Sequence, residues 1–324
     1  MPDSAVAGSS LSAASGFVLI AGWLVRVISI GEVLWDVFGQ EEHLGGAPFN
    51  FAAHLKRLGH EVAFISGVGE DQRGDRILSR MSEMALSTEY VVREPRYSTG
   101  TVTVELSETG QPTFNINRPA AYDFPRLSAS QMNNLFSARV DWIYFGTLMQ
   151  MSREARQLTQ RLLSSNRNVE RFYDVNLRPD SYDPPLVRDL VAHASVVKLN
   201  DTEVPQVAAI VGKPHSSLED FCRTYARTFG WKAVCVTTGA QGCVALIGEE
   251  YVQAKGYSVH VADTVGAGDA FAAAFLHGLW QGWTPSEVAD FANRVGALVA
   301  SRTGAIPMWT LDEVRALKEF GETA

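Results

Sequence analysis

The sequence predicts an α/β fold with a mainly parallel central sheet, and three observations support this prediction. Short apolar segments alternate with longer segments of helical spacing from residue 25 onward. Continuous apolar strands are typical of parallel sheets, because helices cover both of their faces. Alternating strands and helices also supply the crossover connections that parallel strands need. Between residues 98 and 116 the apolar period changes to two, which predicts an inserted hairpin.

The first half of the chain is predicted to begin in the order strand, helix, strand, helix. Residues 25–30 are a continuous apolar strand, and Gly59 ends the helix within GGAPFNFAAHLKRLG. The next strand is EVAFISGVG, and residues 75–84 alternate apolar and charged side chains at helical spacing. The hairpin TGTVTVELSETGQPTFNI is interpreted as part of a lid over a substrate, with a hairpin of no functional role as the alternative.

The alternation of strand and helix resumes in the second half. The predicted strands are VDWIYFG, RFYDVN, ASVVKLN and KAVCVTTG, and ligands of open α/β sheets bind at the carboxyl ends of such strands. A second hairpin-like stretch, GCVALIGEEYVQAKGYSVHVAD, precedes an apolar helix over residues 270–279. Because no repeat or long linker occurs, residues 25–324 are predicted to form one domain after a disordered tail of residues 1–24.

Composition argues against several classes of protein. With 324 residues and 46% hydrophobic content, the chain can form a large core and does not have a disordered composition. A net charge of −8 argues against a nucleic-acid partner, because phosphate backbones select for clustered Lys and Arg. The three cysteines lack zinc-site spacing and are interpreted as buried thiols in a reducing cytoplasm. They are Cys222, Cys235 and Cys243.

The apolar stretch from Gly16 to Ile30 makes an export signal or a membrane segment an alternative. No basic cluster precedes the stretch, and Arg26 interrupts it. It is also shorter than the roughly 20 residues that a membrane-spanning helix requires. We therefore favour a tail followed by a buried strand, in a cytoplasmic protein with no membrane partner.

A phosphate-binding turn is predicted where the chain enters the last apolar helix. Gly266, Ala267 and Gly268 follow a strand and open a helix, so an anion could approach the backbone and meet free N–H groups. Such donors can supply much of the acceleration of phosphoryl transfer. Asp269, beside this turn, is the candidate general base for a hydroxyl proton. The structural alternative for Asp269 is a helix-capping role.

Both common nucleotide-binding motifs are missing from the sequence. The segment GVGEDQRG lacks the spacing of the dinucleotide fingerprint, and neither GxxxxGKS nor GxxxxGKT occurs. The sequence therefore disfavours a dinucleotide-dependent oxidoreductase and a P-loop enzyme.

Two separated motifs resemble those of the ribokinase-like carbohydrate kinases, the PfkB family. They are GGAPFN at residues 45–50 and DTVGAGD at residues 263–269, and the resemblance covers roughly residues 25–312. It implies a ribokinase-like three-layer α/β/α sandwich with a mainly parallel central sheet and a small β-sheet lid. The lid strands would come from about residues 32–47 and 98–118, which agrees with the separate interpretation of the hairpin.

The resemblance also implies which residues hold a sugar. Asp36 matches the family's acceptor for sugar hydroxyls, Asn50 matches a second sugar contact, and Gly45 and Gly46 let the sugar approach the backbone. A short acid and an amide suit vicinal hydroxyls, which both donate and accept hydrogen bonds. The structural alternatives are a loop Asp, an Asn at a helix start and simple turn glycines.

On the nucleotide side, the segment NDTE resembles the family's N-x-x-E element. By this resemblance Glu203 organises Mg²⁺ through water, since Mg²⁺ commonly keeps several waters, and Asn200 lies near the phosphates. The structural alternative for Asn200 is a helix cap. The segment TTGAQG resembles the strand end that lines the nucleotide, with Thr237, Gly239 and Gly242 as candidate contacts.

Two weaker assignments complete the implied nucleotide and ion sites. Asn293 would lie near the adenine, with a place on a helix surface as the alternative. Asp263 and Val265 correspond to positions where the family binds a monovalent cation, usually K⁺. Partner carbonyls for that ion would come from the region of residues 302–304.

Three segments look most like the fructokinase branch of the family. They are Ala47-Pro48, Arg118–Ala121 and DVNLRP, in which the candidate substrate contacts are Asp174, Asn176 and Arg178. The 2-keto-3-deoxygluconate kinases have similar motifs, and an Arg could bind the carboxylate of such a sugar acid. A structural ion pair is the alternative for that Arg. Ribokinase and nucleoside kinase activities also remain open.

The expected function is therefore ATP-dependent transfer of the γ-phosphate to a terminal hydroxyl of a small sugar, with fructose as the preferred acceptor. The expected cofactors are Mg²⁺ with ATP and also K⁺. A non-catalytic sugar-binding regulator is the alternative from another class, although Asp269 and its glycines are intact here. Exposed lid edges favour a homodimer through the lid, because unpaired strand edges readily pair between chains.

Overall fold

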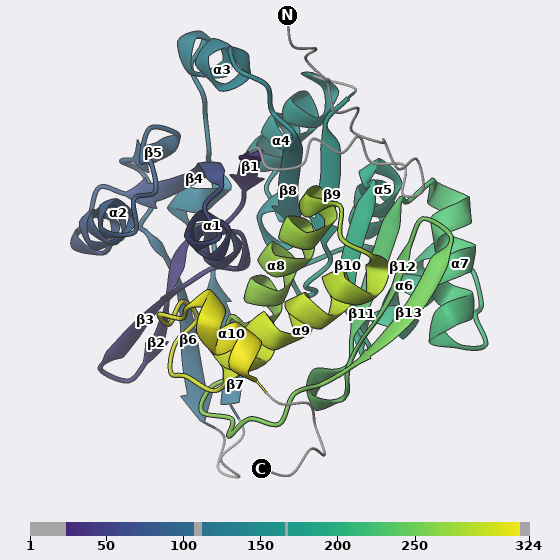
Figure 1. Ribbon diagram of the computed structural model, residues 1–324. Helices are drawn as coiled ribbons and strands as arrows, with labels where there is room; N and C mark the ends of the chain where they lie inside the picture. Colours follow the sequence, from purple (N-terminus) through teal and green to yellow (C-terminus); the bar gives the residue numbers. More distant parts are fainter. Residues whose placement is uncertain (1–23, 107–111, 166–167, 318–324) are drawn as a thin grey trace, which may run out of the picture.

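The computed structural model describes residues 24–106, 112–165 and 168–317, and its largest feature is a nine-stranded sheet (Figure 1). The strand order is β13-β12-β11-β10-β9-β8-β1-β4-β5. Seven neighbouring strands run parallel: β11 (Ala233–Thr237), β10 (Val196–Asn200), β9 (Glu170–Asp174), β8 (Trp142–Gly146), β1 (Arg26–Ile30), β4 (Glu61–Gly69) and β5 (Val91–Glu94). The antiparallel hairpin of β12 (Gly242–Ile247) and β13 (Glu250–Lys255) completes one edge.

Two hydrophobic cores lie on opposite faces of this sheet and separate three layers. In β1, Val27 packs into one core and the next residue, Ile28, packs into the other. Both faces are therefore buried, which is why the central strands are continuous apolar segments in the sequence. One face is covered by α1 (Ala47–Arg57), α2 (Gln72–Glu83), α8 (Ala267–Gln281), α9 (Pro285–Ala300) and α10 (Leu311–Ala316). The other is covered by α3 (Ala129–Phe136), α4 (Arg153–Ser165), α5 (Pro184–His193), α6 (Glu203–Val211) and α7 (Leu218–Phe229).

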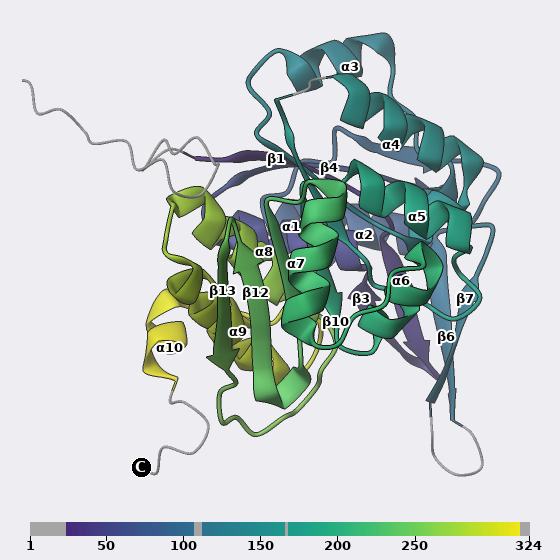
Figure 2. The same ribbon diagram turned by 90° about the vertical axis from the view of Figure 1, so that its right-hand side faces the viewer.

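A side view separates the two helical layers, with α9 and α10 on the left and α5 and α6 on the right (Figure 2). The predicted α/β class with its mainly parallel sheet is confirmed. The helix expected over residues 75–84 begins earlier, at Gln72, because the Asp71 side chain accepts a hydrogen bond from the Gly74 N–H at 2.8 Å and caps it.

The second sheet is small and has the order β3-β2-β6-β7. Its strands come from the two regions expected to supply the lid, and β2 pairs in parallel with β6 between two antiparallel pairs. We refer to these four strands as the lid sheet. They are β2 (Leu34–Phe38), β3 (Glu41–Gly45), β6 (Gly100–Leu106) and β7 (Pro112–Asn117).

Two further expectations concern the tail and the cysteines. Of the predicted tail, residues 1–23 lie outside the described residues, and Leu24 is exposed. The three cysteines are buried and unpaired, as predicted. None of the helices in the described part of the chain is both long enough and apolar enough to cross a membrane.

Candidate active site

The turn that opens α8 leaves two backbone N–H groups free. Gly266 adopts a left-handed conformation with φ of 77°, and a Cβ there would lie 2.4 Å from the Ala305 carbonyl oxygen. The N–H groups of Ala267 and Asp269 donate to carbonyls of the same turn. Those of Gly266 and Gly268 donate to no backbone or side-chain group among the described residues. Within the anion site predicted for residues 266–268, the N–H groups available to bind a phosphate are therefore those of Gly266 and Gly268.

Asp269 lies in the first turn of α8 and is buried. Its Oδ2 accepts a hydrogen bond of 2.8 Å from Nδ2 of Asn50, which α1 places opposite α8. Burial and then the Asp174 carboxylate raise the pKa of Asp269 to about 6, against the opposing effects of Lys198 and the Asn50 hydrogen bond. Asp269 is therefore ionised at neutral pH but basic enough to accept a proton.

Lys198 lies beside the same turn, although the sequence did not point to it. A Cβ on Gly268 would lie 3.4 Å from its Nζ. Lys198 is buried, and its Nζ is 2.9 Å from Oδ1 of Asp174 on the neighbouring strand. Burial lowers the pKa of Lys198, but Asp174, Glu203 and Asp269 outweigh this effect and raise it above its ordinary value. The ammonium is therefore a fixed positive charge next to the free N–H groups.

The structure changes the role expected for Asp174. The sequence placed it against the substrate, but its side chain has no exposed surface. Its carboxylate accepts hydrogen bonds from Lys198 and from the hydroxyl of Tyr144, the latter at 2.8 Å. Asp174 can therefore reach a ligand only through Lys198, which it holds in place.

Asp36 lies in β2 of the lid sheet and is half-buried. It lies opposite His43 in the β2–β3 pair, and a Cβ on Gly45 would lie 2.7 Å from its Oδ2. Burial raises the pKa of Asp36 to about 6, Arg178 and His43 lower it, and Asp263 raises it. Asp36 therefore interacts electrostatically with two other candidate residues from distant parts of the chain, Arg178 and Asp263.

The glycine motif makes the entry to α1 compact. Gly46 has a φ of 110°, and a Cβ there would lie 2.5 Å from the Glu32 carbonyl oxygen. Only glycine fits this approach between residues 32–33 and the start of α1. Asn50, one turn later, is buried; its Nδ2 is used by Asp269, and its Oδ1 has no partner among the described residues.

Arg178 and Asn176 follow β9 at the same edge of the sheet. Arg178 is exposed, and its side chain makes no hydrogen bond or ion pair within the described residues, so the structural ion pair considered for it is not found there. It lies close enough to lower the pKa values of Glu32, Asp36 and Asp269. Asn176 is half-buried in a left-handed conformation with φ of 36°, which Asn tolerates better than most residues.

The N-x-x-E element closes a loop at the start of α6. Oδ1 of Asn200 accepts a hydrogen bond from the Glu203 N–H at 2.9 Å, which is the capping contact considered as the alternative. The two carboxylate oxygens of Glu203 accept backbone N–H groups of Leu177 and Asn200 at 2.7 and 2.8 Å. Burial raises the pKa of Glu203. Glu203 therefore ties the loop after β9 to the end of β10.

The segment TTGAQG contains one open and one enclosed glycine. Thr237 ends β11 beside Asn200, its partner in the β10–β11 register, and is half-buried. A Cβ on Gly239 would meet nothing within 4 Å, whereas one on Gly242 would lie 2.1 Å from the Ala254 carbonyl oxygen. Gly242 is thus required by the backbone turn, and Gly239 is free to face a ligand.

Asn293 has a structural contact in addition to its expected role. Its side chain is buried, and Nδ2 donates to the carbonyl oxygens of Ala254 and Lys255 in β13 at 3.2 and 3.3 Å. The amide attaches α9 to the edge strand. The assignment of Asn293 to the adenine site stays a prediction beside this structural role.

Asp263 connects two loops beside the opening of α8. Its Oδ1 accepts the Val265 N–H at 3.0 Å, and its Oδ2 accepts the Gly304 N–H at 3.1 Å. Residues 302–304 therefore lie where the sequence placed the partner loop of a cation site. The side chain of Val265 is exposed.

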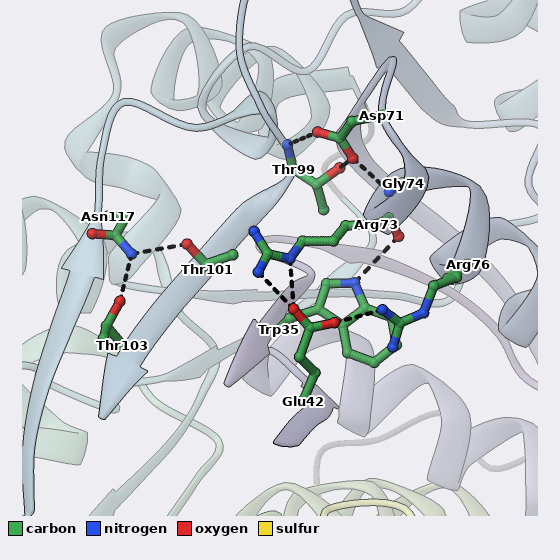
Figure 3. Close-up of polar contacts among 10 residues, drawn as sticks. All are labelled: Trp35, Glu42, Asp71, Arg73, Gly74, Arg76, Thr99, Thr101, Thr103 and Asn117. Atoms are coloured by element: carbon green, nitrogen blue, oxygen red, sulfur yellow. Dashed lines mark hydrogen bonds and ion pairs between the residues drawn. The ribbon is translucent and has the colours of Figure 1, made fainter. Parts of the chain in front are cut away.

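The lid sheet is attached to α2 by a cluster of polar contacts (Figure 3). Glu42 accepts hydrogen bonds from Arg73 at 2.6 Å and from Arg76 at 2.5 Å. The Trp35 indole donates to the Arg73 carbonyl at 3.2 Å, and the Arg76 guanidinium lies over the Trp35 ring at 4.1 Å. Trp35 and Asp36 are adjacent in one strand, so these contacts fix, from the Trp35 face, the strand that carries Asp36 on its other face.

Comparisons with known proteins agree with this geometry. The family model described as pfkB family carbohydrate kinase matches residues 24–311. A Pyrococcus horikoshii protein, provisionally named as a sugar kinase, is 28% identical over 91% of this chain and 96% of its own length. A fructokinase of Vibrio alginolyticus is 28% identical over 81% of this chain and 87% of its own.

The fold is also found among solved structures. The fructokinase of Vibrio cholerae O395, in a form with fructose, ADP and a calcium ion, has a TM-score of 0.72 and 25% identity. The alignment covers 87% of this chain and 95% of that one. The lid sheet and the turn at residues 266–269 therefore belong to a scaffold that is known among sugar-phosphorylating enzymes.

Proposed function

Because the chain belongs to the PfkB family of carbohydrate kinases, we propose that it transfers the γ-phosphate of ATP to a terminal hydroxyl of fructose. A kinase acting on a sugar follows from the family. Fructose as the acceptor is supported by relatives named fructokinase, at 28% identity, and by the fructose in the Vibrio cholerae structure.

One observation supports the mechanism most strongly: Asp269 lies beside two free backbone N–H groups and a buried ammonium. In the proposed reaction Asp269 accepts the proton of the sugar hydroxyl, and the hydroxyl oxygen attacks the γ-phosphorus while ADP leaves. The N–H groups of Gly266 and Gly268 and the charge of Lys198 stabilise the transferred phosphoryl oxygens. Asn50 orients the carboxylate of the base through its 2.8 Å hydrogen bond.

Mg²⁺ is the divalent ion that fits this arrangement when it is bound to ATP. The described residues contain no group of three or more His, Cys, Asp or Glu side chains able to hold a metal. Mg²⁺ commonly uses substrate phosphates and waters as ligands. Each oxygen of the Glu203 carboxylate accepts one N–H and keeps a further acceptor site for such a water. When bound, the ion would withdraw negative charge from the phosphates.

The loop at residues 263–265 is the proposed K⁺ site. Its support is the pair of hydrogen bonds from Asp263 to the N–H groups of Val265 and Gly304, which bring two loops together beside α8. An ion held there would stabilise the turn that carries the free N–H groups. We propose a dimer through the lid sheet on the weaker ground that its edges are available for pairing.

The substrate is tested by measuring ADP release from Mg-ATP with fructose, 2-keto-3-deoxygluconate, ribose and adenosine. Each acceptor is assayed in K⁺ and in Na⁺ buffers. We expect the highest kcat/KM with fructose and a higher rate in K⁺. A preference for 2-keto-3-deoxygluconate would support the kinase assignment but replace fructose as the proposed acceptor. Arg178 would then be the ligand of the sugar carboxylate. No ADP above the sugar-free background with any acceptor would contradict the kinase assignment.

The attachment of the lid sheet is expected to affect sugar binding. Glu42→Gln removes the charge that holds Arg73 and Arg76, and these partly exposed pairs are each worth about 0.2–1 kcal/mol. Because Asp36 lies in the attached sheet, we expect the KM for the sugar to rise about two- to fivefold with little change in the KM for ATP.

Glu83→Gln is the matched control for the lid attachment. It breaks an exposed ion pair with Arg80 in the same helix, α2, without touching the lid sheet. Initial-rate kinetics on both variants check the prediction. Equal sugar KM values in Glu42→Gln and wild type would contradict it.

A further inference from the structure

Glu32 is a buried acid at the edge of the site that the proposed mechanism does not use. It follows the end of β1 and is only 5% exposed. Its carbonyl oxygen lies against Gly46, at the start of the helix that carries Asn50. Its carboxyl oxygen Oε2 has no hydrogen-bond partner among the described residues. A buried carboxyl without a partner is costly, so this atom is expected to meet a ligand.

The groups around Glu32 are those of the active site. Burial raises the pKa of Glu32 to about 7; a hydrogen bond from its own backbone, Arg178 and Arg118 lower it, and Asp269 raises it. Glu32 therefore interacts electrostatically with the candidate base. Neither arginine satisfies it: the Arg118 side chain donates to Asp123 and to a backbone carbonyl, and the Arg178 side chain makes no hydrogen bond or ion pair within the described residues.

Two more unpartnered polar atoms lie near this acid. Oδ1 of Asn50 and the hydroxyl of Tyr122 are buried and have no partner among the described residues. Burial, then Asp123 and to a smaller extent Glu32 raise the pKa of the Tyr122 hydroxyl, and Arg118 lowers it. Asn50 contacts Asp269 directly. The three atoms together can both accept and donate hydrogen bonds, which suits a polyol, whose hydroxyls do the same.

We propose that Oε2 of Glu32 accepts a hydrogen bond from a hydroxyl of the acceptor sugar other than the one that is phosphorylated. The inference rests on the proposed sugar kinase function and extends it to sugar selection. Glu32 would act on binding, because it contacts a group that does not react. Its removal should therefore affect the KM for the sugar more than kcat.

The test uses Glu32→Gln, with Glu61→Gln as the matched control at the exposed, opposite end of the sheet, where Glu61 begins β4. Assays at pH 8, above the pKa of Glu32, keep the carboxylate ionised. A hydrogen bond to a charged group predicts a rise of about tenfold or more in the sugar KM of Glu32→Gln. The KM for ATP and the kinetics of Glu61→Gln should stay unchanged.

Sugar analogues that each lack one hydroxyl identify the contact. One analogue, which lacks the hydroxyl that contacts Glu32, should have a lower kcat/KM than the full sugar with the wild-type enzyme. With Glu32→Gln, the same analogue and the full sugar should have similar kcat/KM values, because the variant has already lost that hydrogen bond. A lower Tm with an unchanged sugar KM would make Glu32 a structural residue and overturn the inference. So would analogue losses that are equal in the two proteins. If wild type phosphorylates no sugar, the proposed function itself is wrong, and this inference fails with it.

Discussion

Replacement of Asp269 by Asn is expected to lower kcat by about 10² to 10⁴, because the sugar hydroxyl then loses its proton acceptor. The amide has the shape of the carboxylate, so the fold and both substrate sites should persist. Wild-type kcat, measured at saturating sugar, should fall as pH falls through about 6, the pKa of Asp269, since protonation removes the base. Steady-state kinetics and the pH profile of both proteins check these expectations.

A control separates catalysis from helix stabilisation at Asp269. Asp75 is also an acid in the first turn of a helix, α2, but it is exposed and outside the site. Asp75→Asn should leave kcat unchanged. If Asp269→Asn retains wild-type kcat, Asp269 only stabilises its helix, and the general-base assignment is wrong.

Replacement of Lys198 by Met should lower kcat by about 10² to 10³, the usual effect of losing one preorganised donor to a transition state. The same change leaves Asp174 buried without its partner, which should reduce the free energy of unfolding by about 3–5 kcal/mol. Both effects are large, and they must be separated.

The double variant Lys198→Met with Asp174→Asn separates these two effects. It removes the uncompensated charge, so much of the lost stability should return, as measured by chemical denaturation. The kcat value should remain low, because the ammonium beside Gly268 is still missing. A double variant with wild-type kcat would show that Lys198 matters only for folding.

The fold was predictable because its determinants are local in the sequence. Strands buried on both faces must be continuously apolar, as the alternate packing of Val27 and Ile28 illustrates. The two-residue apolar period over residues 98–116 predicted the hairpin of the second sheet, and the glycines before Asp269 predicted the turn at the start of α8. Each of these patterns is contained in one short segment of the sequence.

The role of Lys198 was not predictable in the same way. It lies opposite Asp174 in the parallel register of β9 and β10, a neighbour relation that a single sequence does not state. One signal was available: a lysine inside the apolar segment ASVVKLN must find a buried partner, because an isolated charge is costly there. Glu32 carried a similar signal, as an acid that follows a buried strand after one intervening glycine.

The amides show why the sequence leaves some site roles open. An Asn at a helix start or within a helix can bind a ligand or satisfy backbone groups, and both roles use the same donors and acceptors. Asn200 caps α6, and Asn293 bonds to two carbonyls of β13. Only the tertiary structure shows which backbone groups need a partner.

Phosphorus NMR tests the central claim most directly, by following wild type and Asp269→Asn with Mg-ATP and the most active sugar of the panel. With wild type, we predict a sugar phosphate resonance that grows in proportion to ADP, without free phosphate, while the variant shows almost none. ADP accompanied by inorganic phosphate instead of a sugar phosphate, or equal sugar phosphate from both proteins, would contradict a sugar kinase in which Asp269 is the base.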